Sequence, residues 1–206
     1  EQDLVKQPKG ILLHPMQADP FIEPINRAIE SGVAIVTFAA DSPNSKRVSY
    51  ITSDNLAEAK YAAEEIAGLL GGKGEYAVLE NPGQSNHDLR VTAFIAYMEK
   101  NYPDLKLVGR QASNQDSNKA YQATLAMLQA NPNLGAIWIP EAGSAEGAVA
   151  AKLEAGSDVI IMHADVTPTT LEHIKAGNIH KALNPNQGIQ AYVGFLATFM
   201  AAHPDL

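Results

Sequence analysis

The stretch AIWIPEAGSAEGAVAAKLEAGSDVIIM, residues 136–162, decides the fold. It places two short apolar runs, 136–139 and 159–162, on either side of an alanine-rich segment at 144–155. Short apolar runs that alternate with helical segments are typical of strand–helix–strand units with parallel strands. Such strands are apolar throughout because helices cover both faces of a parallel sheet.

The same unit recurs along most of the chain. Further apolar strands are predicted at 76–79, 105–108 and 179–183, and each strand is joined to the next through a helix. We therefore predict an α/β fold in which residues 76–183 form a complete, doubly wound parallel sheet of five strands. The segment before it supplies two strands, at 10–13 and 33–38, which cannot bury both faces alone.

Helix starts are marked by side chains that accept hydrogen bonds from free backbone N–H groups. Asp, Ser or Thr before a helical run predicts such starts at Asp19, Asp54, Asp116 or Ser117, Ser144 and Thr167. The run Gly71-Gly72-Lys73-Gly74 follows a helix and precedes a strand, which is the reverse of a phosphate-binding loop. We interpret it as a helix end.

Composition excludes several classes of protein. The chain of 206 residues carries a net charge of −8, which argues against binding to nucleic acid or to an anionic membrane. It has no cysteine, so disulfides, thiolate metal sites and cysteine nucleophiles are excluded. No apolar run is long enough to span a membrane. With 46% hydrophobic and 18% charged residues, the composition is that of a globular protein.

Catalytic and metal-binding motifs are not found in the sequence. Gly143-Ser144 lies at a strand-to-helix turn but lacks the G-x-S-x-G spacing of a nucleophile elbow. The six histidines show neither HxxxH nor HExxH spacing, and no GxGxxG occurs. We therefore predict no enzyme, no metal and no cofactor. An α/β enzyme with Asp88, Glu141 and Asp165 as acid or base groups stays open as an alternative.

Ligands of parallel α/β sheets bind beyond the carboxyl ends of the strands. The side chains in those positions are mostly amides and carboxylates, which favours a neutral polyhydroxylated or a cationic ligand over a phosphate. The alternative is that Asp, Asn and Ser stand there only as helix caps. The candidates are His14, Asp41, Asn81, Gln84, Ser85, Asn86, Asp88, Asn114, Gln115, Asp116, Glu141, Asp165 and Asn184.

An ordered set of segments resembles the periplasmic sugar-binding proteins of the ribose-binding type, a superfamily that also contains the effector domains of LacI-type repressors. Residues 42–47, Ser-Pro-Asn-Ser-Lys-Arg, followed by Ser-Asp-Asn at 53–55, are the best marker and are more similar to the transporter-associated members. The set comprises residues 10–15, 32–38, 41–47 and 50–55, Arg90 with Phe94, residues 136–141 and 159–165, Asn184-Pro185 and Gly188.

This resemblance implies two Rossmann-like lobes of the type I periplasmic binding fold, joined by crossovers and closing on a ligand. Crossovers are expected near residues 50–54 and 183–188. We therefore expect a partial N-terminal lobe at 1–52, a C-terminal lobe at 53–186 and a helix at 187–206 that returns to the first lobe. The ends of the chain look cut, and we expect the first lobe to be incomplete.

The resemblance also implies which side chains bind the ligand. Asp165 matches an aspartate of the family, and Arg90 matches an arginine that we interpret as structural. The expected ligand-binding residues are His14, Asp41, Ser85, Asn86, Asp88, Gln115, Glu141, Asp165 and Asn184.

Four positions depart from the family pattern. Ala39 replaces an aspartate, Asp88 an arginine, Gln115 an aromatic residue and Glu141 an asparagine. These changes make the predicted site more acidic and remove a stacking surface for a sugar ring. They favour a polyol, an amino sugar or another hydroxylated metabolite over a plain pentose or hexose.

By resemblance, the chain is expected to be an extracytoplasmic solute-binding protein of an ABC-type uptake system. It would be periplasmic, or otherwise outside the cytoplasm with or without a lipid anchor, and monomeric when intact. Its partners would be a sugar or polyol and a membrane permease, without nucleic acid and without insertion into the bilayer. Two alternatives stay open, the effector-binding core of a LacI-type regulator and the ligand-binding domain of a chemoreceptor or sensor.

Overall fold

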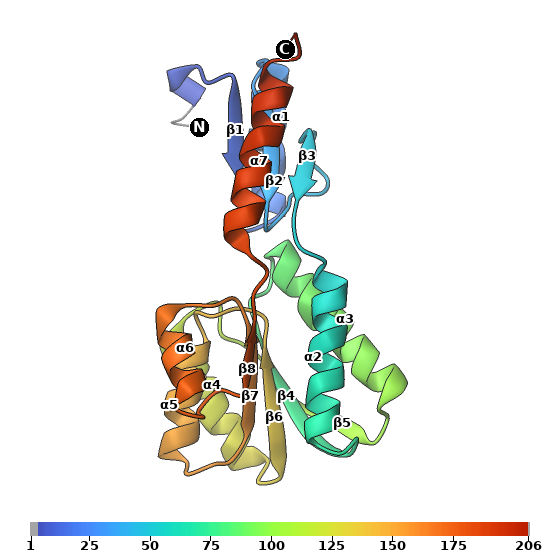
Figure 1. Ribbon diagram of the computed structural model, residues 1–206, viewed down its shortest axis with the longest axis vertical. Helices are drawn as coiled ribbons and strands as arrows, with labels where there is room; N and C mark the ends of the chain where they lie inside the picture. The colour runs from blue at the N-terminus through green and yellow to red at the C-terminus, as the bar shows by residue number, and fades with distance from the viewer. Residues whose placement is uncertain (1–3, 206) are drawn as a thin grey trace. The chain divides into compact units, whose positions relative to one another are not determined.

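The computed structural model describes residues 4–205 (Figure 1). Contacts between residues divide the described chain into two units. The first unit holds residues 4–53, 83–86 and 185–205, and the second holds 54–82 and 87–184. Compared with the boundaries expected from the sequence, this division also assigns the short segment 83–86 to the first unit.

The described part of the second unit holds a five-stranded parallel sheet with the order β5-β4-β6-β7-β8. Its strands are β4 (Gly74–Glu80), β5 (Leu105–Ala112), β6 (Leu134–Ile139), β7 (Ile160–Ala164) and β8 (Lys181–Leu183). The predicted doubly wound sheet is confirmed, because strand order runs outward in both directions from β4 and β6.

Helices cover both faces of this sheet (Figure 1). Helices α2 (Asn55–Leu69) and α3 (Ser85–Asn101) pack on one face, and α3 begins with residues that belong to the first unit. Helices α4 (Ser117–Ala130), α5 (Ala145–Glu154) and α6 (Pro168–Lys175) pack on the other face.

Strand β6 shows why the run at 136–139 is apolar at every position. Trp138 faces α2 and α3, where its ring stacks on that of Phe94 with 5.6 Å between the ring centroids. Ile137 and Ile139 face α4 and α5. Successive side chains of a strand point to opposite faces, so a strand buried on both faces needs an unbroken apolar run.

Three predicted helix starts are confirmed. The Asp54 carboxylate accepts from the backbone N–H groups of Leu56 and Ala57 at 3.1 and 2.9 Å, and Asp116 caps α4 in the same way. Thr167 forms a reciprocal capping box with Thr170 at the start of α6. The glycine run after α2 is confirmed as a helix end, with positive φ at Gly71 and Gly72.

One predicted start is wrong, and another is correct in position but not in its capping bond. Ala18, which already has helical dihedrals, is the N-cap residue of a 3₁₀ turn (Asp19–Phe21), so Asp19 is the first residue of that turn and not a cap. Helix α1 (Ile22–Glu30) then begins after Phe21, without a side-chain capping bond in the described residues. Ser144 precedes α5, but its hydroxyl donates to the Ser113 hydroxyl at 2.8 Å instead of capping the helix.

The described part of the first unit contains a three-stranded parallel sheet, β1 (Gly10–Leu13), β2 (Ala34–Phe38) and β3 (Ser49–Ile51), in that order. The prediction of two strands is therefore wrong, because the segment expected only as a crossover also pairs with β2. Helix α1 packs on one face of this sheet and α7 (Gln187–Ala202) packs on the other.

Candidate functional site

The carboxyl ends of β5, β6 and β7 bring together three of the predicted site residues, Gln115, Glu141 and Asp165. A Cβ atom added at Gly143 would lie 2.9 Å from the Gln115 carbonyl oxygen and 3.0 Å from Glu141 Oε2. The turn after β6 is therefore packed tightly against the turn after β5. Asp165 is close enough for its charge to act on Glu141. The three side chains form a polar, acidic edge on the second unit.

Glu141 is the most informative of the three. Its side chain is buried, and Oε2 accepts the backbone N–H of Ser144 at 3.1 Å. The other oxygen, Oε1, is buried without a hydrogen-bond partner among the described residues. Burial is the largest cause that raises the pKa of Glu141, and the charge of Asp165 adds to it, while hydrogen bonds from Ser144 and Gly143 oppose it. A buried acceptor without a donor is costly, so this oxygen is suited to a ligand hydroxyl or ammonium.

Replacing Glu141 with glutamine is expected to stabilise the protein at neutral pH. The pKa of Glu141 is raised in the folded state. The carboxyl group therefore adds to the free energy of unfolding below about pH 4.5, where it is protonated, and this contribution is lost as pH rises through the raised pKa. We expect E141Q to unfold at higher denaturant concentration than the parent at pH 8, with a difference that shrinks toward pH 4.5. Urea unfolding across this range measures it. A difference that grows as pH falls would contradict the assignment.

Arg90 links three of the elements that form this edge. Its guanidinium is buried, with Nε 2.8 Å from Glu58 Oε2 and Nη1 3.0 Å from the carbonyl oxygen of Pro140, which precedes Glu141. Nη1 also lies 3.8 Å from Asp165 Oδ1. These partners tie α2, the end of β6 and the end of β7 to one side chain, which supports the interpretation of Arg90 as structural.

Unusual backbone conformations occur at the same strand ends. Asn114 and Gln115 after β5, and Asp165 after β7, have φ values of 55°, 59° and 68°, and Ala39 after β2 in the first unit has 59°. Left-handed dihedrals cost a non-glycine residue about 1 kcal/mol or more and persist where the surroundings impose them. Their occurrence at strand ends marks these turns as functional candidates.

The sequence reasoning missed His163 in β7, whose ring is fully buried. Nδ1 lies 2.8 Å from the carbonyl oxygen of Ala164, so Nδ1 carries the proton and donates. Nε2 is then an acceptor, and it is buried without a partner in the described chain. Burial lowers the pKa of His163 and keeps it neutral. The available signal was a histidine inside an otherwise apolar strand, two residues before Asp165.

In the first unit, Asp41 and Ser85 are in contact, since the Asp41 backbone N–H donates to Ser85 Oγ at 2.7 Å. The Asp41 carboxylate forms a bidentate ion pair with Arg47. Arg47 Nη2 lies 2.5 Å from Asp41 Oδ2, and Arg47 Nε donates to Asp41 Oδ1. Thr37 Oγ1 donates to the same Oδ1 at 2.7 Å. These internal partners occupy the oxygens that the sequence-based expectation assigned to a ligand.

His14 and Asn86 carry the unpartnered polar atoms of the first unit's predicted set. His14 Nε2 and Asn86 Oδ1 are buried and have no hydrogen-bond partner within residues 4–205. The His14 ring lies 5.5 Å from that of Phe38, and burial lowers the pKa of His14. A neutral imidazole and an amide are well suited to hydroxyl groups.

The remaining predicted residues are less informative. Asp88 in the first turn of α3 and Asn184 after β8 are both exposed. Among the other positions considered, Asp116 is a helix cap, and Asn81 pairs with His87 at 3.0 Å. No group of three or more His, Asp or Glu side chains that could hold a metal ion occurs in the described part of the chain.

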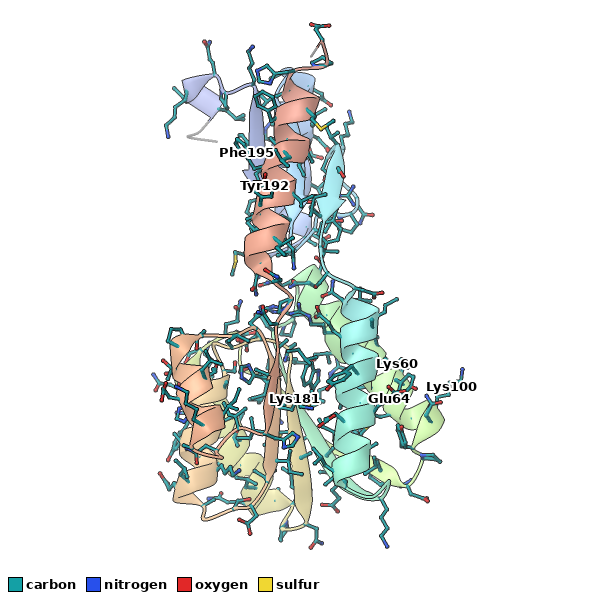
Figure 2. The ribbon with its side chains drawn as sticks, viewed as in Figure 1. Lys60, Glu64, Lys100, Lys181, Tyr192 and Phe195 are labelled. Carbon is teal, nitrogen blue, oxygen red and sulfur yellow. The ribbon has the colours of Figure 1, made fainter. Side chains whose placement is uncertain are left out.

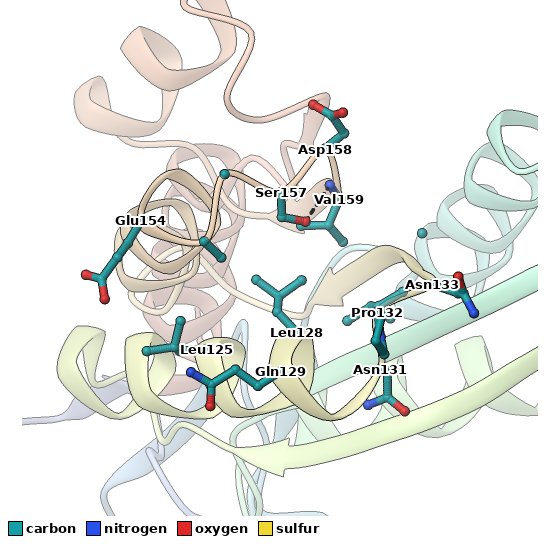
Figure 3. Close-up of a pocket in the computed structure, with 14 residues that line it drawn as sticks. Leu125, Leu128, Gln129, Asn131, Pro132, Asn133, Glu154, Ser157, Asp158 and Val159 are labelled. Carbon is teal, nitrogen blue, oxygen red and sulfur yellow. Dashed lines mark hydrogen bonds between the residues drawn. The ribbon is translucent and has the colours of Figure 1, made fainter.

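A cavity of about 780 Å³ lies elsewhere in the second unit, where α4 and α5 end and β6 and β7 begin (Figure 3). It is lined by apolar side chains such as Leu125 and Leu128 and by polar ones such as Glu154 and Asp158. None of the predicted ligand residues is among those that line it. It is at the amino edge of the sheet, opposite the edge where parallel sheets bind ligands.

Comparison with known proteins identifies the fold and its relatives. The family model described as a periplasmic binding protein domain matches residues 1–203. A D-apiose import binding protein from Actinobacillus succinogenes is 30% identical over 86% of this chain. The D-allose-binding periplasmic protein of Escherichia coli is 28% identical over 88%. The chain spans only about three fifths of these relatives, 58% and 61% of their length.

A solved structure of a sugar-binding protein also matches this chain. The sugar-binding protein of a sugar ABC transporter from Bacillus halodurans superposes with a TM-score of 0.89 at 28% identity. The match covers 98% of this chain and 70% of the solved one.

Proposed function

We propose that this chain, which belongs to the periplasmic binding protein domain family, binds a sugar or a sugar-like polyhydroxylated ligand for an ABC-type uptake system. The unpartnered Glu141 Oε1 at the carboxyl edge of the second unit carries the proposal. This oxygen is a buried acceptor that a hydroxyl or ammonium group of a ligand would satisfy. The import binding proteins for D-apiose and D-allose among its relatives support the same ligand class.

The side chains at this edge favour ligands that donate hydrogen bonds over anionic ligands. Glu141 and Asp165 offer carboxylate oxygens, and Gln115 offers an amide beside them. Charge-assisted hydrogen bonds to such oxygens are about twice as strong as neutral ones. Arg90 is already engaged by Glu58 and the Pro140 carbonyl, so its charge is compensated within the second unit. We propose a polyol or an amino sugar in preference to a sugar phosphate.

Further ligand contacts are proposed at the positions expected from the sequence. In the second unit these are Asp88 and Asn184, and in the first unit His14, Ser85 and Asn86. We assign Asp41 a different role. Its carboxylate positions Arg47 and the loop after β2, and its backbone N–H fixes Ser85.

We also propose that the chain binds without turnover, acts outside the cytoplasm and docks on a permease. Its relatives are named as binding proteins, which supports a role in capture. The net charge of −8 supports a function without nucleic acid.

Thermal unfolding with a ligand panel tests the proposal. The panel holds D-allose, D-apiose, a pentitol, glucosamine and, as the anionic control, glucose 6-phosphate. A ligand at 100 times its Kd should stabilise the chain by about 2.7 kcal/mol, and we expect this from a neutral or cationic member. Stabilisation by the phosphate alone, or by no member, would contradict the proposal.

Substitutions then locate the site. Glu141→Gln and Asp165→Asn should each weaken binding about tenfold, because a neutral hydrogen bond replaces a charge-assisted one. Asp158→Asn in the opposite cavity removes the same charge and should leave the affinity unchanged. Equal losses in all three variants would show a general effect of charge and not a site.

A further inference from the structure

His163 is a polar side chain at a position of β7 where burial alone favours an apolar one. Charged side chains of the second unit can lie at its surface, as the exposed pair Lys60 and Glu64 on α2 does (Figure 2). His163 is instead fully buried, on a strand that lies between β6 and β8. Its neighbours on the same face of the sheet are Ile161 of β7 and Ile139 of β6, and both belong to the apolar core under α4 and α5.

The two ring nitrogens of His163 have different surroundings. Nδ1 donates to the carbonyl oxygen of Ala164 at 2.8 Å. Nε2 is buried and has no hydrogen-bond partner among the described residues. A buried acceptor without a donor lowers the free energy of unfolding. The ring is therefore a costly way to fill this part of the core, which indicates that its bond to Ala164 serves something other than stability.

The carbonyl group that His163 contacts belongs to the peptide unit between Ala164 and Asp165. This unit is planar, so a hydrogen bond that holds the carbonyl group of Ala164 also holds the N–H group of Asp165. The next rotation along the chain is φ of Asp165, which is 68°. A left-handed backbone of this kind persists in a non-glycine residue only where its surroundings impose it. The value of φ also decides where the Asp165 side chain points.

The ion pair of Asp165 is a weaker restraint on this backbone. Arg90 Nη1 lies 3.8 Å from Asp165 Oδ1, which is beyond hydrogen-bond distance. It also acts on the end of the side chain, whereas the bond from His163 acts on the main chain directly before Asp165.

We infer that His163 is a positioning residue for Asp165, because its Nδ1–H group fixes the peptide unit that precedes the left-handed backbone at the end of β7. The inference rests on the ligand-binding role proposed above for Asp165. It adds that the affinity for the ligand depends on a buried side chain that does not itself contact the ligand.

Two substitutions separate this role from packing. His163→Asn keeps an N–H donor at the place of Nδ1, because Asn Nδ2 and His Nδ1 are both bonded to Cγ. His163→Leu fills a similar volume without a donor. In the chain without ligand, we expect His163→Leu to change the HN–Hα coupling and the Cα chemical shift of Asp165, and His163→Asn to keep the parent values. Gln115, with φ of 59°, is the control in the same spectra and should not change.

Urea unfolding should rank the two variants in the opposite order. His163→Leu removes the unpartnered Nε2 from an apolar core, so its midpoint should be at least as high as that of the parent. His163→Asn leaves a smaller polar side chain there and should lower the midpoint. Ile161→Val is the matched core variant, and it should lower the midpoint while the Asp165 signals stay in place.

Ligand binding provides the functional readout. With D-allose or D-apiose, His163→Leu should weaken binding about tenfold, and His163→Asn should weaken it less than about twofold. In the Asp165→Ala chain, His163→Leu should cause no further loss, since its effect passes through the Asp165 carboxylate.

Parent values of the Asp165 coupling and shift in His163→Leu would overturn the inference. So would altered values in His163→Asn or Ile161→Val, a lower midpoint for His163→Leu than for His163→Asn, or a further loss of affinity from His163→Leu in the Asp165→Ala chain. Absence of binding by every member of the panel would contradict the proposed function alone. The measurements without ligand would still decide the role of His163.

Discussion

Replacing Gly147 with alanine is expected to lower the free energy of unfolding by about 3 kcal/mol, or to prevent the second unit from folding. Gly147 lies in α5 where this helix crosses the start of α4. A Cβ atom there would lie 1.9 Å from the Ser117 carbonyl oxygen and 2.8 Å from the Tyr121 backbone nitrogen. Both are backbone atoms of α4, so no flexible side chain can move aside and the two helices must separate.

Gly68 provides the matched control for this substitution. It is an exposed glycine inside α2, and a Cβ atom added there would meet no described heavy atom within 4 Å. Gly68→Ala should therefore leave stability unchanged or raise it by up to about 1 kcal/mol through helix propensity. Urea unfolding of both variants measures the contrast. Equal stabilities would mean that the packing of α4 on α5 is looser than described.

Replacing Arg90 with methionine is expected to cost about 3 kcal/mol of stability. The substitution leaves the Glu58 carboxylate, only 15% exposed, without its partner, and it removes the donor to the Pro140 carbonyl. Breaking a buried ion pair from one side is costly because the remaining charge is uncompensated. The loss should be partly recovered in Arg90→Met/Glu58→Gln, which removes that charge.

Arg110 offers a comparison on the same sheet. It pairs with Glu80 at 2.7 Å, and the Glu80 side chain is 16% exposed, much like that of Glu58, but the Arg110 side chain is 52% exposed against 2% for Arg90. Water can take the place of an exposed guanidinium, so Arg110→Met should cost less than Arg90→Met, about 1 kcal/mol. Chemical denaturation of the two arginine variants and the double variant gives the coupling energy. Similar losses at Arg90 and Arg110 would contradict the structural role assigned to Arg90.

The alternation of strands and helices could be predicted because its signals are local. The run at 136–139 is apolar at each position, and burial of Trp138 on one face and Ile137 on the other explains why. The caps at Asp54 and Thr167 were equally predictable, since their partners lie two or three residues away.

Contacts over long distances in the sequence could not be predicted in the same way. Ser144 fits the pattern of a helix cap, but Ser113, 31 residues earlier, takes its hydroxyl. The partner of Arg90 is 32 residues away on α2. Asp41 and Arg47 are close in sequence, yet only the folded loop shows that the pair occupies both carboxylate oxygens.

The candidate site was predictable in position more than in detail. The rule that ligands bind beyond the strand ends selects Gln115, Glu141 and Asp165, which the fold brings to one edge. It cannot indicate that Glu141 keeps one oxygen without a partner in the described chain, or that Asp165 has a left-handed backbone. His163 was missed because the sequence cannot distinguish a histidine that only packs in the core from one with an unpartnered ring nitrogen. The hydrogen-bond partners of the two nitrogens are known only from the folded structure.

Ligand binding at the carboxyl edge of the second unit is tested most directly by amide chemical-shift mapping of the ¹⁵N-labelled chain. Titration with D-allose or D-apiose should move the resonances of Gln115, Glu141 and Asp165 in a saturable way. Resonances of residues 131–135 and 154–159, around the opposite cavity, should stay in place. Saturable shifts confined to that cavity, or no saturable shifts with any polyhydroxylated ligand, would contradict the proposed site.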